Sequence, residues 1–116
     1  MIATPGQDQN RPNHPCWNKD YQVQALRVEL ADGNLYVFPY RRFAFARFES
    51  GQYHDTLHVL LDTHKIQITG KHLREVAVAF QKFAVDWVRE LPARYDAQAD
   101  DGHAWITDIA VNETSG

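Results

Sequence analysis

The chain contains 116 residues, of which 44% are hydrophobic and 23% charged, and these proportions are typical of a single globular domain. Its formal charge is −3, from 12 basic and 15 acidic residues, so it lacks the basic excess usual in proteins that bind a nucleic-acid backbone. A lone cysteine, Cys16, excludes an internal disulfide framework.

The N-terminal segment 1–19 contains three prolines, one glycine and many amide side chains. Such a segment buries too little apolar surface to offset the entropy of ordering it, so a disordered tail is expected. The rest should form one domain over residues 20–112, with a frayed C-terminus at 113–116. No apolar run resembles a signal peptide or reaches the length of a membrane span, so we expect a cytoplasmic protein without membrane contact.

Alternating apolar residues over 21–30 predict the first strand, with Leu26 and Val28 on its buried face. The sequence Asp32-Gly33-Asn34 follows, and such residues favour a tight hairpin turn because they tolerate positive φ. Residues 35–38 are then the returning strand, which Pro39 either ends or confines to a sheet edge.

A second hairpin is predicted from residues 56–61 and 64–69, whose apolar side chains alternate on one face of each strand. Between the two hairpins, residues 40–50 are compatible with a third strand or with an irregular crossing segment. Alternation over residues 103–111 predicts a last strand near the C-terminus.

Between the second hairpin and this last strand, apolar residues recur at intervals of three and four. This spacing predicts one long amphipathic helix over residues 71–91, which Pro92 ends. The expected fold class is therefore α+β: a mostly antiparallel sheet of about five strands packed on one long helix. Two hairpins, a crossing segment and a C-terminal strand would supply those strands.

Segment 41–48 resembles the RNP1 pattern of RNA-recognition motifs at six of eight positions. An extended chain would place cations and phenylalanines on one face, where bases stack and phosphates are neutralised. The candidate binding residues are Arg41, Arg42, Phe43, Phe45 and Arg47. The resemblance implies single-stranded nucleic-acid binding, although that family has a strand, a helix and a strand before the segment and no helix is predicted there. Alternatively, these phenylalanines belong to the core or to an edge.

A second candidate surface lies on the predicted helix, where Val78 and Val85 are seven residues apart, outside the main apolar face. Together with Arg74 and Gln81 they form a possible dimer seam. The chain also has 14 aromatic residues, several of them between residues 38 and 53, and aromatic side chains are enriched at protein interfaces.

The leading hypothesis is a non-catalytic binding or protein-interaction module, with a protein partner or self-association. Single-stranded nucleic-acid binding through segment 41–48 is the alternative, followed by a small enzyme that uses His54, Asp55 or His58. No catalytic constellation and no cofactor loop is evident. No metal site is expected either, because strand alternation places His58 and His64 on opposite faces.

Overall fold

The computed structural model describes residues 16–91 and 102–114, and these residues form an α+β fold. The expected fold class is confirmed. The predicted tail at 1–15 and the last residues 115–116 lie outside the described part. In chain order the elements are β1 (Trp17–Lys19), β2 (Ala25–Glu29), β3 (Leu35–Pro39), the 3₁₀ turn η1 (Tyr40–Arg42), β4 (Phe43–Glu49), β5 (Asp55–Leu61), β6 (His64–Lys71), α2 (Arg74–Phe80), β7 (Val85–Arg89) and β8 (Trp105–Glu113).

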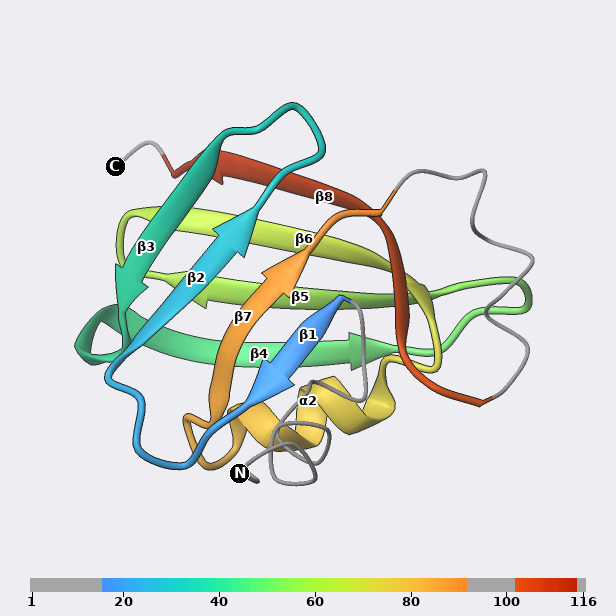
Figure 1. Cartoon of the computed structure of the whole chain (residues 1–116), viewed down its shortest axis with the longest axis horizontal. Coiled ribbons are helices and arrows are strands. Elements are labelled where there is room, and N and C mark those ends of the chain that lie inside the picture. The colour runs from blue at the N-terminus through green and yellow to red at the C-terminus, as the bar shows by residue number, and fades with distance from the viewer. Residues whose placement is uncertain (1–15, 92–101, 115–116) are drawn as a thin grey trace, which may run out of the picture.

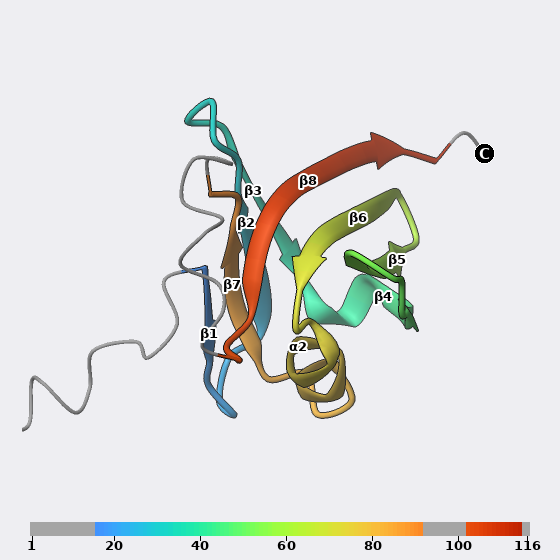
Figure 2. The same ribbon diagram turned by 90° about the vertical axis from the view of Figure 1, so that its right-hand side faces the viewer.

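The strands form two sheets of four, in the orders β1-β7-β2-β3 and β4-β5-β6-β8. We call these sheet A and sheet B. Their strands cross at an angle (Figure 1), and the two sheets face each other with α2 at one end of the space between them (Figure 2). The prediction of a single sheet with about five strands was therefore imprecise, since the described residues form two sheets with four strands each. The apolar faces of the two hairpins cover one another, so the core lies between sheets as well as against the helix.

Both predicted hairpins are confirmed. β2 pairs with β3 in antiparallel register around the Asp32-Gly33-Asn34 turn, and Gly33 adopts φ of 95° there. β5 pairs with β6 in the same manner, which places Val59 opposite Ile66. These pairs form because each strand alternates apolar and polar residues, so only one register buries the whole apolar face.

The predicted long helix is wrong beyond Phe80. After α2 the chain turns, Phe83 takes a left-handed φ of 52°, and the chain continues as β7. β7 lies between β1 and β2, parallel to β2 and antiparallel to β1. A central strand is buried on both faces, so Val85, Trp87 and Val88 are all buried. Three apolar residues in four, interrupted by Asp86, also fit a helical spacing, while the β-branched and aromatic residues favour a strand.

Residues 16–19, assigned to the tail by their sequence context, belong to the domain instead. Trp17 and Val88 are Cα partners in the β1–β7 pair, and Cys16 and Trp17 are both buried. The Cys16 thiol donates to the carbonyl oxygen of Ala104 at 3.2 Å, and burial raises the pKa of Cys16 to about 11. β8 likewise extends to Glu113, inside the stretch expected to fray. The buried side chains of Cys16 and Trp17 complete the core at the edge of sheet A.

The core lies between the sheets and under α2. From α2 and the residue before it, the core takes Leu73, Val76, Ala79 and Phe80. The largest fully buried side chains of the strands are Trp17, Leu26, Val28, Leu57, Val59, Ile66, Ile68, Val85 and Ile106. The strand orders leave β1, β3, β4 and β8 as edge strands, each of which pairs with one other strand of the described chain.

Candidate functional site

The aromatic-basic segment 41–48 is divided between two elements. Arg41 and Arg42 lie in η1, and β4 begins at Phe43. A β-bulge between Phe43 and Phe45 shifts the register against β5. Because the extra residue inverts the alternation, Phe43 packs against the core, whereas Phe45 is 50% exposed on the outer face. The predicted common face for the two phenylalanines and their flanking arginines is therefore wrong.

Phe43 belongs to an aromatic cluster beside α2. Its ring stacks on that of Phe80, with centroids 5.8 Å apart, and the ring of Phe83 meets it edge-on at 5.6 Å. Tyr40 packs against all three rings and donates its hydroxyl to the carbonyl oxygen of Val85 at 2.6 Å. Burial raises the pKa of the Tyr40 hydroxyl above its ordinary value. Phe43 is thus a packing residue that holds α2 against β4.

Two of the three arginines of this segment have acidic neighbours. Arg42 forms an ion pair with Asp62 at 2.8 Å, and Arg47 lies 3.8 Å from Glu49. Arg41 is exposed and forms no ion pair within residues 16–91 and 102–114. With one ring turned inward and two guanidinium groups beside carboxylates, the segment does not present a continuous platform for stacked bases and phosphates.

The proposed dimer seam also changes. Its helical basis is wrong, because α2 ends at Phe80 and Val85 is fully buried in β7. Arg74, Val78 and Gln81 remain exposed on or just after α2, with Val78 at 55% exposure. The three exposed residues border a groove that the sequence pattern did not indicate.

This groove follows the junction of α2 and β4 as two adjoining hollows of about 300 and 270 Å³. Ala46, Ala77 and Gln81 line both hollows, and the two short alanine side chains leave the space open. The first is also lined by Phe43, Ala44, Phe45, Phe80 and Phe83, and the second by Phe48, Arg74 and Val78. We call this surface the α2–β4 groove. It joins Phe45 from one predicted site with the three exposed residues of the other.

Three large apolar side chains are exposed around the α2–β4 groove: Phe45 at 50%, Val78 at 55% and Phe83 at 49%. The left-handed backbone at Phe83 turns the chain away from the helix here. At the far end, the guanidinium of Arg74 lies over the ring of Phe48, with its carbon 5.8 Å from the ring centroid. The groove therefore has an apolar lining and one cationic end.

Of the three candidate enzyme residues, His54 and Asp55 line one hollow, whereas His58 lies apart from them. Asp55 accepts a hydrogen bond from the backbone N–H of Leu73 at 3.1 Å, so its carboxylate holds the chain before α2. His58 is three residues along the same strand and faces the other side, where its Nε2 lies 3.1 Å from Glu49. His54 lies in the loop before β5 and lines a hollow of about 210 Å³ with Asp55.

His58 and His64 lie on opposite faces of sheet B, as alternation predicts. His58 is the Cα partner of Arg47 and Gln67 on the outer face, whereas the ring of His64 packs on Phe38 at 5.1 Å. Within residues 16–91 and 102–114, no three histidine, cysteine, aspartate or glutamate side chains gather as a metal site requires.

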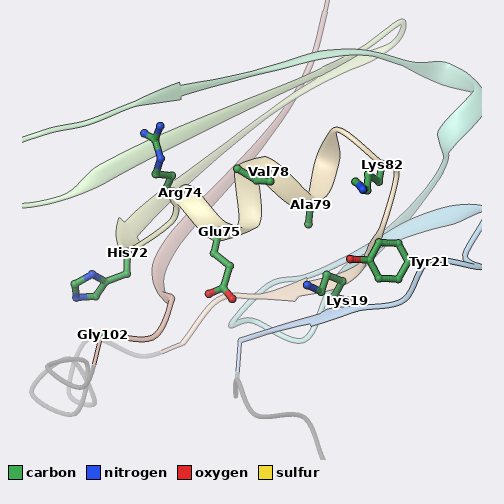
Figure 3. Close-up of a pocket in the computed structure, with 9 residues that line it drawn as sticks. All are labelled: Lys19, Tyr21, His72, Arg74, Glu75, Val78, Ala79, Lys82 and Gly102. Carbon is green, nitrogen blue, oxygen red and sulfur yellow. The ribbon is translucent and has the colours of Figure 1, made fainter.

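A larger hollow, of about 500 Å³, lies on the other side of α2. Ala79 and Glu75 extend into it from the helix, while Lys19 and Tyr21 face them from β1 and the following turn (Figure 3). Arg74 points away from it, toward β4. Its full lining is Lys19, Tyr21, His72, Arg74, Glu75, Val78, Ala79, Lys82 and Gly102. All but Ala79 are partly or fully exposed, and their mixed charges select no ligand.

Comparison of the chain with protein-family models, curated proteins and solved structures found no match. In the described part, no helix has the length and apolarity needed to cross a bilayer. The functional argument therefore depends on the surfaces described above.

Proposed function

We propose that this protein is a non-catalytic interaction module whose α2–β4 groove binds a short segment of a partner protein. The observation that carries the proposal is the exposure of Phe45, Val78 and Phe83 around two adjoining hollows. Exposed apolar side chains gathered around a concave surface, with a polar rim, mark protein-interaction sites more often than isolated exposed residues do.

The lining of the groove indicates the chemistry of the partner segment. Each hollow has room for one large apolar side chain, because the volumes are about 300 and 270 Å³. Gln81 lines both hollows and offers an amide that donates to and accepts from a peptide backbone. Arg74 supplies a cation at one end, so an acidic residue in the partner would be favoured there. The expected ligand carries two apolar anchors and one carboxylate.

Other functions have less support from the same residues. A base-stacking platform needs Phe43 and Phe45 on one face, and the enzyme alternative needs one cleft around His54, Asp55 and His58. Neither condition holds in this fold. We place the module in the cytoplasm within the same proposal, supported by its single, unpaired Cys16.

A displayed library of random peptides selected on the purified full chain tests the proposal. Selected peptides should combine two apolar residues with one acidic residue, and should bind Phe45→Asp and Val78→Asp about 30-fold more weakly than the parent, as for interface hot spots. Tyr53→Asp is the matched control, since Tyr53 is 75% exposed but lies outside the groove.

The result would oppose the proposal if the library yields no peptide, or if the peptides bind the groove variants and the parent equally. Circular dichroism of each variant separates loss of binding from loss of folding. Arg74→Glu gives a second readout, because reversing that charge should shift the selected peptides from acidic to basic residues.

A further inference from the structure

The edge strand β3 is unusually apolar on the surface. Leu35, Tyr36 and Val37 are 55%, 37% and 59% exposed, and β3 pairs only with β2 in the described chain. No residue from 33 to 40 carries a charge. Natural edge strands normally carry lysines, bulges or inward charges that prevent pairing with another chain. On β3 only Pro39, at its end, has that effect.

Two backbone hydrogen bonds fix which residues of β3 bond to β2. The N–H of Leu30 donates to the oxygen of Asn34 at 2.8 Å, and the N–H of Tyr40 donates to the oxygen of Gln24 at 2.9 Å. Both pairs continue the register of the β2–β3 ladder, one beyond each end. In an antiparallel ladder, hydrogen-bonded and non-hydrogen-bonded pairs alternate. The even-numbered residues of β3 therefore direct their backbone groups toward β2.

The odd-numbered residues consequently face the open edge. Leu35 and Val37 each direct one N–H and one C=O outward, while Pro39 has only a C=O to offer. The edge thus presents four unpaired groups that are symmetric about Tyr36. A strand pairing with this edge must supply two donors and two acceptors at the same spacing.

We propose that the occupant of this edge is the β3 strand of a second copy of the chain, in antiparallel register with Tyr36 opposite its own counterpart. Leu35 of each copy then pairs with Val37 of the other, which satisfies all four groups on each strand. The pairing is isologous, as closed dimers require, and it joins two copies of sheet A into one eight-stranded sheet.

Neighbouring registers are less favourable. Centring the pair on Val37 places Leu35 opposite Pro39, which has no N–H to donate. Centring it on Leu35 requires the N–H of Gly33, which already donates to the oxygen of Leu30 at 3.1 Å within the turn. Only the register centred on Tyr36 uses every free group.

The charges on the outer face of β2 favour the same register. Glu29 lies beside Leu35, and Arg27 lies beside Val37. With Tyr36 at the centre, one cross-strand row contains Glu29 of one copy and Arg27 of the other, about 14 Å apart at three strand spacings. The registers centred on Leu35 or Val37 would place like charges in a row instead. Within each copy Glu29 also pairs with Arg27 at 2.7 Å and with Arg89 at 2.9 Å, so the effect is small at this distance, and its sign favours this register over the two neighbouring ones.

A cross-linking experiment on the full chain tests the register. In Tyr36→Cys the two new thiols lie on directly opposite residues, within the Cα separation of a disulfide, whereas in Val37→Cys the two are diagonal and beyond about 7 Å. Native Cys16 is fully buried and does not compete. Under a mild oxidant, Tyr36→Cys should give a covalent dimer and Val37→Cys should remain monomeric. Equal cross-linking of both, or of neither, overturns the proposal.

Charge variants test the self-association by sedimentation equilibrium. Leu35→Lys or Val37→Glu alone should weaken the dimer at least about tenfold, because each places an unpaired charge at the pairing strand. The double variant Leu35→Lys/Val37→Glu should recover dimerisation, since opposite charges then face each other at both pairs. A parent that is monomeric up to millimolar concentration, or a double variant weaker than either single one, contradicts the inference. The α2–β4 groove is unchanged in all of them, so peptide binding reports on it separately.

Discussion

Two of the four edge strands, β4 and β3, are protected to different degrees. β4 has a bulge, carries the charged residues Arg47 and Glu49, and lies beside α2, which leaves a shaped groove next to it. β3 has none of these features and exposes three consecutive apolar residues. An edge covered by a helix can select a foreign segment through its hollows. A flat edge can select only a strand with the same hydrogen-bond spacing, and a second copy meets that condition.

The largest effect is expected at Phe80, whose ring fixes α2 beside β4. Phe80→Ala should lower the free energy of unfolding by about 3–5 kcal/mol, because a buried aromatic ring is lost and a cavity remains. Urea denaturation measures this. Val78→Ala on the same helix is the control and should change stability by less than about 0.5 kcal/mol. If the two variants are equally stable, α2 does not protect the β4 edge as described.

A smaller effect tests the bulge in β4. Phe43→Ala should cost about 2–3 kcal/mol, since its half-buried ring packs on Phe80, whereas Phe45→Ala should cost less than about 1 kcal/mol. Thermal unfolding of the two variants compares them directly. Equal losses would mean that both rings face the same side, and the register shift between β4 and β5 would then be incorrect.

The smallest effect concerns pH. A hydrogen bond from His58 and the nearby Arg47 hold the pKa of Glu49 below its ordinary value of 4.5. The folded state therefore binds fewer protons at this carboxylate than the unfolded chain does. The contribution of Glu49 to the free energy of unfolding is fully present above its unfolded pKa and is lost as pH falls through its folded pKa. Urea midpoints of the parent and Glu49→Gln should converge in acid. A constant difference down to pH about 2 would show that Glu49 does not stabilise the β4–β5 pair through its charge.

The sequence predicts both hairpins correctly because each is local: two alternating strands joined by a short turn, Asp32-Gly33-Asn34 in one and Asp62-Thr63 in the other, specify one register. The strand pairs that β7 makes join segments that are far apart in the sequence. Trp17 follows a proline-rich stretch and looks like part of a tail, yet it is buried through a pair with β7 that no local pattern indicates. The division into two sheets depends on such distant pairs, and pattern reasoning does not reach them.

The predicted helix failed for a related reason. A strand buried on both faces and a helix buried on one face both give frequent apolar residues, and Val85 and Val88 fit either pattern. The error placed Val85 on an exposed seam. The bulge after Phe43 had a similar effect on the aromatic segment, because one extra residue moves Phe45 to the opposite face. Single residues were assigned correctly as exposed, such as Val78, but their grouping into surfaces needed the tertiary fold.

The position of β7 between β1 and β2 has a consequence for biosynthesis. A chain emerging from the ribosome presents β1 and β2 long before β7, which pairs with both of them. Trp17, for example, pairs with Val88, which is synthesised 71 residues later. The β5–β6 hairpin and its β4 neighbour can pair earlier, since their contacts are close in sequence. Sheet A is therefore assembled late, and until then the nascent chain exposes the inner side of β2, which gives chaperones and proteases their opportunity to act.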